Sequence, residues 1–229
     1  MSRDEIVRGK AAEGYQCLLA LFEKTHGHNH PNMAGALSNL ATFATQRGHY
    51  TKTEVLLRRA PTIYELNEGK ESTNVASSLN NLGSLFVASG AYPEAESALI
   101  RAIEIEEKLS ASSSELLATS LTNLGHSYVQ QLHYDRAEPL VRRALEINEK
   151  FHGPNHPDVA STLGLLAVIC EETGRRRQAA HLRQRAAAII AASRNQTIPL
   201  TNRPASMGIF VACSLVRDQS TASGPHRSS

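Results

Sequence analysis

The chain has 229 residues, enough for one extended domain or two small ones with a buried core. Aromatic residues make up only 5% and tryptophan is absent, which favours packed helices over a β-sandwich. The 24 Lys and Arg nearly balance the 22 Asp and Glu, so no strong overall charge selects a nucleic acid or a membrane as partner. The three cysteines, Cys17, Cys170 and Cys213, are far apart and indicate reduced thiols instead of a disulfide framework.

Two features of the sequence predict a cytoplasmic location. The N-terminal stretch MSRDEIVRGK lacks the apolar segment of a secretory signal. The longest apolar run, at 207–216, is too short to span a bilayer, which takes about 20 residues.

The sequence repeats with a period of 42 residues. The stretch HGHNHP at 26–31 returns as HGPNHP at 152–157, and this offset of 126 residues is three times 42. Positions between the two stretches keep the same spacing in all four copies: Ala34, Ala76, Ala118 and Ala160; Leu37, Leu79, Leu121 and Leu163; Leu40, Leu82, Leu124 and Leu166; Ala60, Ala102, Ala144 and Ala186. Such a period indicates stacked copies of one structural unit.

Each period predicts two amphipathic helices. In the second copy, Val75, Leu79, Leu82 and Phe86 recur at steps of three and four residues, which gives one apolar stripe. A glycine then ends this helix and a proline opens the next one. The small residues Gly83 and Ala95 let the two helices approach closely, and the second helix buries Leu99, Ala102 and Ile103. We expect helix pairs at about 33–68, 74–109, 115–151 and 157–193, preceded by a single helix within 5–25.

Some positions depart from the repeat. Pro61 falls inside the second helix of the first pair, where we expect a kink. Leu132 replaces the glycine that ends the first helix in the other copies. The fourth pair has Cys170 where the third has Tyr128, and Arg183 in place of an apolar residue. This degeneracy is typical of a terminal repeat whose outer face meets water.

The pattern L-G/A-x-x-[FY], then G-x-Y-x-x-A, then A-[LI]-x-I resembles the tetratricopeptide repeat. The 42-residue period and the HP-D-V-A-x-x-L opening at 156–163 resemble the kinesin light chain and nephrocystin type. This resemblance implies an all-α, right-handed superhelical solenoid of helix–turn–helix repeats. It divides the chain into a half-repeat and loop (1–31) and four repeats (32–193). The tail at 194–229 breaks the period, and its richness in Ser, Thr, Arg and Pro predicts disorder around one short apolar segment.

The resemblance also implies a binding face, because the first helices of such repeats line a concave groove that holds an extended peptide. On the stripe opposite the apolar one we expect these groove residues: Asn39, Asn80, Asn81, Ser84, Thr122, Asn123, His126 and Gln130. Small and amide-bearing side chains leave room for a peptide main chain and offer it both donors and acceptors. The alternative is that the asparagines hydrogen-bond between neighbouring repeats and hold the superhelix. None of these positions is basic, which disfavours a groove that grips a terminal carboxylate.

A second candidate surface lies in the stretch RRRQAAHLRQR at 175–185. Its arginines could dock an acidic partner or a signalling enzyme: Arg175, Arg176, Arg177, Arg183 and Arg185. The alternative is the solvated face of a terminal helix. No aromatic residues interleave the arginines, which argues against binding of single-stranded nucleic acid.

The histidine-rich turn at 26–31 raises the question of a metal site. His26 and His30 match His152 and His156 of the other copy, so we interpret both stretches as turns that cap a helix. No Cys, Asp or Glu stands near 26–30 at a recognised ligand spacing, and we predict no metal there, although a metal-handling role is the alternative.

The sequence contains no catalytic motif, so we expect no enzyme activity, no cofactor and no small-molecule substrate. The acidic cluster of Glu104, Glu106 and Glu107 is expected on an exposed helical face, where it adds solubility. We therefore predict a scaffold or adaptor that binds protein partners through peptide segments. The alternative is a regulatory protein that acts through its arginine-rich end and tail.

Overall fold

The computed structural model describes residues 20–21, 23–25, 27–45, 50–109 and 115–195. These residues form helices α2 (Pro31–Thr45), α3 (Tyr50–Glu68), α4 (Thr73–Ser89), α5 (Tyr92–Leu109), α6 (Glu115–Gln130), α7 (Tyr134–His152), α8 (Pro157–Glu172) and α9 (Arg176–Asn195). No strand occurs within these ranges. Most of the expected half-repeat and the tail beyond residue 195 lie outside the described residues.

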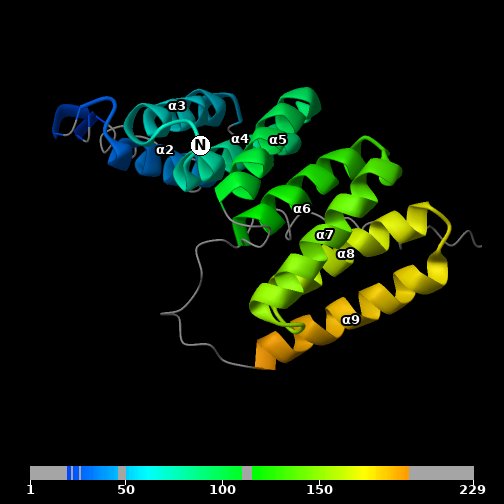
Figure 1. Cartoon of the computed structure of the whole chain (residues 1–229). Helices are drawn as coiled ribbons and strands as arrows, with labels where there is room; N and C mark the ends of the chain where they lie inside the picture. Colours follow the sequence, from blue (N-terminus) through cyan, green and yellow to red (C-terminus); the bar gives the residue numbers. More distant parts are fainter. Residues whose placement is uncertain (1–19, 22, 26, 46–49, 110–114, 196–229) are drawn as a thin grey trace, which may run out of the picture.

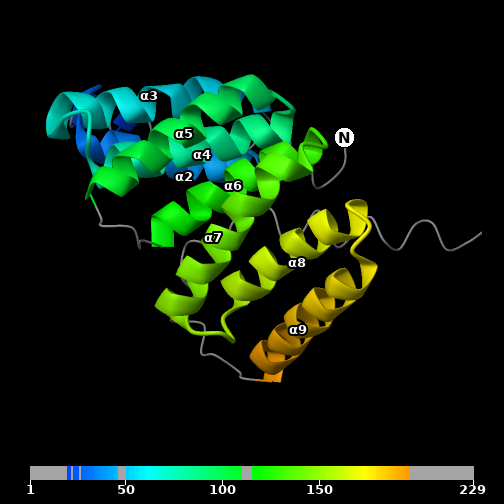
Figure 2. The same ribbon diagram turned by 45° about the vertical axis from the view of Figure 1, so that its right-hand side comes forward.

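The helices pair in chain order as antiparallel hairpins, α2 with α3, α4 with α5, α6 with α7 and α8 with α9 (Figures 1 and 2). Each hairpin stacks on the next, and the first helices α2, α4, α6 and α8 also pack against one another in sequence. The second helices make no comparably close backbone contacts among the described helices, so the first helices lie on the inner side of the array. The expected all-α solenoid of helix–turn–helix repeats is confirmed.

Local sequence explains where the helices begin and end. The hydroxyl of Ser72 accepts a hydrogen bond from the backbone N–H of Val75 and caps α4 at its N-terminus. Gly90 ends α4 with φ of 79°, in the left-handed region that glycine adopts without steric cost. Leu132 occupies the same turn position one repeat later and adopts φ of 63° although it carries a Cβ atom. The fold therefore holds a leucine at this turn in the left-handed backbone conformation that favours glycine.

A kink is expected at Pro61, and α3 continues through this residue without a break. This helix runs from Tyr50 to Glu68 with Pro61 inside it, and the proline ring is buried.

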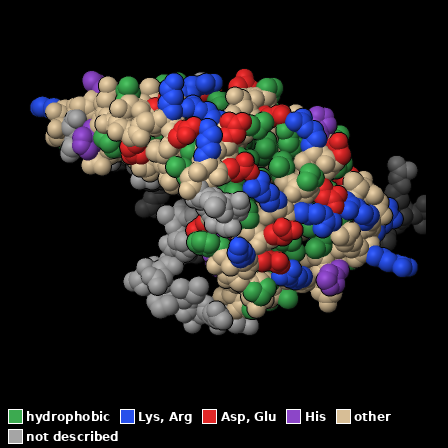
Figure 3. Space-filling model, in the orientation of Figure 1, with side chains coloured by type: hydrophobic (Ala, Val, Ile, Leu, Met, Phe, Trp, Pro, Cys, Tyr) green, Lys and Arg blue, Asp and Glu red, His purple; other side chains and the backbone are tan. Residues whose placement is uncertain are grey.

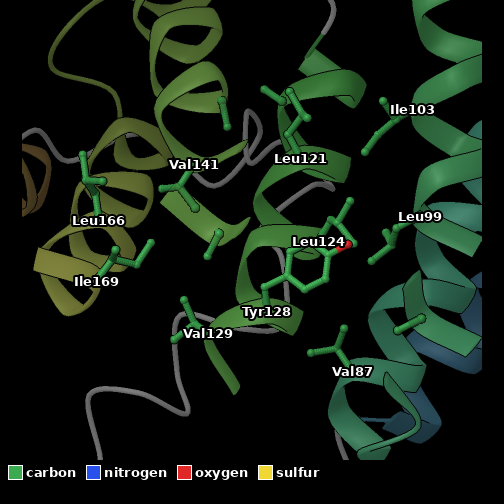
Figure 4. Close-up of a cluster of buried hydrophobic side chains, with 14 of the residues drawn as sticks. Val87, Leu99, Ile103, Leu121, Leu124, Tyr128, Val129, Val141, Leu166 and Ile169 are labelled. Carbon is green, nitrogen blue, oxygen red and sulfur yellow. The ribbon is translucent and has the colours of Figure 1, made fainter. Parts of the chain in front are cut away.

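The largest hydrophobic core cluster runs through successive hairpins, and three smaller clusters lie within the hairpins α2–α3, α4–α5 and α8–α9. Figure 4 shows side chains of α4, α5, α6, α7 and α8 that meet in this core, among them Val87, Leu99, Ile103, Leu121, Leu124, Tyr128, Val129, Val141, Leu166 and Ile169. The close approach predicted at Gly83 is confirmed, because a Cβ atom there would lie 2.5 Å from Cγ of Leu99. At Gly125, in the next repeat, a Cβ atom would lie 2.5 Å from Cγ2 of Val141. Glycine at these positions lets the two helices of a hairpin pack backbone against side chain.

None of the described helices has the length and apolar character that crossing a lipid bilayer requires.

Candidate functional site

The inner helices differ in charge from the outer ones. Helices α2, α4, α6 and α8 contain no lysine and no arginine, and α2 and α4 contain no acidic residue either. The basic residues of the described helices lie on α3, α5, α7 and α9. Figure 3 shows these basic side chains mixed with acidic ones across the visible face of the array. The inner face is therefore polar without net positive charge.

Two of the expected groove residues bond to each other across neighbouring repeats. The side-chain amide of Asn123 on α6 donates to Oδ1 of Asn80 on α4 over 2.9 Å. The hydroxyl of Ser120 donates to the same oxygen over 3.2 Å. Asn80 is buried, with 6% of its surface exposed, so its carbonyl oxygen serves the contact between α4 and α6.

Asn81 and Ser84 lie on α4 beside this pair and are only half-buried. Neither side chain forms a hydrogen bond with any other residue that the structure describes. The amide of Asn81 thus keeps two donors and an acceptor for another molecule. Asn39 occupies the equivalent position on α2, but its side chain lies outside the described part of the chain.

The stripe of expected groove residues on α6 continues toward the end of that helix. The hydroxyl of Thr122 donates to the backbone carbonyl of Ala118, one turn earlier in the same helix. His126 is half-buried and one of its ring nitrogens lies 3.2 Å from the side-chain nitrogen of Gln130, which is exposed. Burial lowers the pKa of His126, which favours its neutral form at physiological pH. The stripe therefore ends in an uncharged imidazole and an exposed amide.

The arginine-rich stretch is largely occupied by ion pairs within the chain. Arg175 donates to both carboxylate oxygens of Glu138 over 2.7 and 2.6 Å, and Arg142 bonds the same carboxylate. The hydrogen bonds from Arg175, followed by those from Arg142, lower the pKa of Glu138 to about 2. Glu138 is the equivalent of Glu96 in the preceding repeat, where Glu96 accepts a hydrogen bond from Tyr128.

The remaining arginines divide into two groups. Arg183 bonds Glu171, and Arg185 lies 2.6 Å from Glu149 of the preceding repeat. Arg176 and Arg177 are exposed, and no ion pair with another described residue joins either of them. Among the five arginines of the stretch, only these two form no ion pair within the described chain.

A ladder of ion pairs links the second helices, and the sequence analysis missed it. Each arginine bonds a glutamate 36 residues earlier, in the preceding repeat: Arg59 with Glu23 (3.1 Å), Arg101 with Glu65 (2.5 Å), Arg143 with Glu107 (2.5 Å) and Arg185 with Glu149 (2.6 Å). Both the glutamates and the arginines recur every 42 residues, which is the signal that could have revealed the ladder.

The ladder corrects the prediction for the acidic cluster on α5. Glu104 and Glu107 are exposed as expected, and Glu107 is also ion-paired with Arg143. Glu106, expected on an exposed face, is buried with 2% of its surface exposed. The prediction is wrong for Glu106 because a helix in a stack buries more than one stripe, against both its own hairpin partner and the next repeat.

The two histidine-containing turns cap helices, as interpreted from the sequence. Nδ1 of His30 accepts from the backbone N–H of Asn32 over 3.1 Å at the start of α2. Nδ1 of His156 accepts from the backbone N–H of Asp158 over 3.3 Å at the start of α8. His28 lies 3.2 Å from a carboxylate oxygen of Glu23, and His26 lies outside the described residues.

Solved structures with a similar arrangement include two kinesin light chain-like repeat proteins. BtubC (BKLC) from P. vanneervenii superposes with a TM-score of 0.70 at 27% identity, and the match covers 90% of this chain and 81% of that one. A putative kinesin light chain from Podospora anserina with nearly identical repeats has a TM-score of 0.67 at 22% identity, covering 82% of this chain and 88% of that one. The apo form of RapI shares the fold at a TM-score of 0.69 and 18% identity, over 81% of this chain and 65% of that one.

A comparison with curated proteins found no match. The tetratricopeptide repeat family matches residues 32–108 and 116–192, which together are most of the chain. These two segments contain all four described hairpins apart from a few terminal residues. The chain therefore belongs to the tetratricopeptide repeat family.

Proposed function

We propose that the chain is a non-catalytic cytoplasmic adaptor that binds extended peptide segments along the inner face of α2, α4, α6 and α8. The observation that carries this proposal is the half-buried amide of Asn81, which has no hydrogen-bond partner among the described residues and lies beside the small side chain of Ser84. A peptide main chain needs paired donors and acceptors, and an amide supplies both.

The charge of the inner face indicates the kind of peptide. Because the four inner helices contain no lysine or arginine, the face offers no partner to an acidic segment or to a terminal carboxylate. Neutral Asn81, Ser84, His126 and Gln130 suit an internal peptide segment that is recognised through its backbone. The likeness to kinesin light chain-like proteins supports an adaptor role for the same face.

Docking of an acidic partner on the arginine-rich stretch has less support. Arg175, Arg183 and Arg185 already bond glutamates of the chain, and a partner would have to compete with them. Arg176 and Arg177 remain as the residues that could carry such a contact.

A peptide-display selection against the whole chain tests the proposal, with the selected peptide then titrated by fluorescence polarisation. Ser84→Arg places a long side chain on the inner face, and Gln130→Arg does so at an exposed position. Ser97→Arg on the outer helix α5 is the matched control. We expect Ser84→Arg and Gln130→Arg to weaken binding by about tenfold or more, equal to about 1.4 kcal/mol, and Ser97→Arg to leave it unchanged.

Circular dichroism and urea unfolding should first show that the variants fold alike. If Arg176→Glu/Arg177→Glu removes binding while Ser84→Arg and Gln130→Arg preserve it, the partner docks on the arginine-rich end and the groove proposal is wrong.

A further inference from the structure

The turn between α7 and α8 gathers three metal-ligating side chains at one place. His152 is the last residue of α7, His156 caps α8, and Asp158 lies in the first turn of α8. Gly153, with φ of 85°, turns the chain between the two histidines so that their rings stack at 4.2 Å. One ligand atom of each residue lies within 4.8 Å of those of the other two.

The distances between the ligand atoms suit a small tetrahedral ion. Oδ2 of Asp158 lies 3.8 Å from Nε2 of His152 and 3.3 Å from Nδ1 of His156. Tetrahedral zinc with bonds of 2.0–2.1 Å has ligands about 3.3 Å apart. A fourth ligand could come from another element, because Oε1 of Glu115, the first residue of α6, lies 3.8 Å from Nε2 of His152.

The hydrogen bonds around the cluster leave a place for a cation. Nε2 of His152 is buried and has no hydrogen-bond partner among the described residues. Nδ1 of His156 accepts the backbone N–H of Asp158, so this nitrogen carries no proton and its one lone pair is directed at that amide. A cation beside Nε2 of His152 and the Asp158 carboxylate would give this buried nitrogen a partner and offset the charge of the carboxylate.

We propose that His152, His156 and Asp158, completed by Glu115, bind a divalent transition metal of the zinc class. Two imidazoles and carboxylate oxygens are ligands that zinc accepts. The ion would join the end of α7, the start of α8 and the first turn of α6, and would fix one hairpin relative to the next. The site lies at the end of α7 and at the starts of α6 and α8 and includes none of the proposed groove residues, so it does not depend on the proposed peptide binding.

Binding requires one change in the turn. The two rings lie within 13° of parallel, so an ion cannot lie in both ring planes at once, and one ring must rotate. His156 is the more exposed ring, with 31% of its side chain accessible against 15% for His152. Its rotation breaks the hydrogen bond from the Asp158 amide, so this amide reports on metal binding.

The turn at 28–32 supplies a matched control. His30 caps α2 as His156 caps α8, but Asn32 stands where Asp158 stands and offers no carboxylate. The variant Asp158→Asn therefore gives the second turn the residue that the first turn has naturally.

The test is calorimetric titration of ZnCl₂ into the whole, tag-free chain after treatment with a chelator. We expect one zinc ion per chain, and binding weakened by about tenfold or more in both His152→Gln and Asp158→Asn. His28→Gln and His30→Gln should bind as the wild type does. In the NMR spectrum of the wild type, zinc should shift the backbone amide of Asp158.

Absence of zinc binding in the wild type overturns the proposal. Binding that survives in Asp158→Asn and falls in His28→Gln or His30→Gln overturns it as well, and would reveal adventitious binding at the first turn. If His152→Gln does not fold, Asp158→Asn and the amide shift still decide the question.

Discussion

The side-chain amide of Asn123 donates a hydrogen bond to Oδ1 of Asn80 across the boundary between two repeats, over 2.9 Å. Asn80 thereby belongs to the contact between α4 and α6, where Ser120 bonds the same oxygen. Its neighbour Asn81 has no such partner among the described residues. Adjacent asparagines of one helix are thus candidates for different tasks, one holding the array together and the other contacting a ligand.

This difference predicts opposite stability effects for two adjacent substitutions. Asn80→Ala should lower the free energy of unfolding by about 1–3 kcal/mol, because it leaves a buried hydroxyl and an amide without their acceptor. Asn81→Ala should change it by less than about 0.5 kcal/mol. Urea unfolding followed by circular dichroism measures both, and equal losses would contradict the division of tasks.

Two glycines should respond in opposite ways to alanine. At Gly125 a Cβ atom would lie 2.5 Å from the stiff side chain of Val141, so Gly125→Ala should destabilise by about 1–3 kcal/mol through overpacking. At Gly164 no neighbouring atom of the described chain lies within 4 Å of the added Cβ, so Gly164→Ala should stabilise by up to about 1 kcal/mol through its helix propensity. Thermal unfolding of the two variants compares the effects directly, and a stabilised Gly125→Ala would refute the close packing of α6 on α7.

The left-handed leucine offers a stabilising substitution. Leu132 is 70% exposed and has φ of 63°, so Leu132→Gly gives up little packing and relieves strain. The relief of about 1–2 kcal/mol is reduced by the greater freedom of glycine in the unfolded chain, and the net gain should be roughly 0.5–1 kcal/mol. Gly174→Ala, at the same turn of the last repeat with φ of 80°, should destabilise. Chemical denaturation tests the pair, and a loss of stability in Leu132→Gly would contradict the expectation.

The cluster around Glu138 should make stability depend on pH in the acid range. Its pKa in the folded chain is lowered to about 2, below the value of 4.5 expected for the unfolded chain. The ionised carboxylate therefore contributes stability that is complete above about pH 5 and is lost as the pH falls from 4.5 toward 2. Glu138→Gln should be less stable than the wild type at pH 7, and the gap should narrow below about pH 4.5.

Urea unfolding in steps from pH 7 to pH 3 follows this gap. As a control, Glu104→Gln alters an exposed carboxylate of α5 and should show no such narrowing. A gap that stayed constant down to pH 3 would mean that Arg175 and Arg142 do not hold the Glu138 carboxylate in its ionised form.

Much of the fold could be predicted from the sequence because it depends on local patterns. The apolar stripe of Val75, Leu79, Leu82 and Phe86 requires a helix, and the 42-residue period requires that the same hairpin be stacked four times. A Cβ atom at Gly83 would lie 2.5 Å from Leu99 of the same hairpin, so the requirement for a small residue there follows from a single repeat. The expected face of Asn81, Ser84 and Gln130 follows in the same way from helical spacing.

The contacts between repeats could not be predicted, because they depend on how far each hairpin is displaced and rotated relative to the last. Glutamates at the position of Glu107 and arginines at the position of Arg143 recur every 42 residues in the sequence. Only the stacking of the helices brings Nη1 of Arg143 to 2.5 Å from Oε1 of Glu107. The same geometry decides that Asn80 faces α6 whereas Asn81 does not. It also turns His152 back beside His156 and Asp158 and brings Glu115 of another helix to 3.8 Å from His152. The sequence by itself thus determined the repeating unit, and the tertiary structure decided which side chains of neighbouring units meet, because that depends on long-range packing that no single repeat encodes.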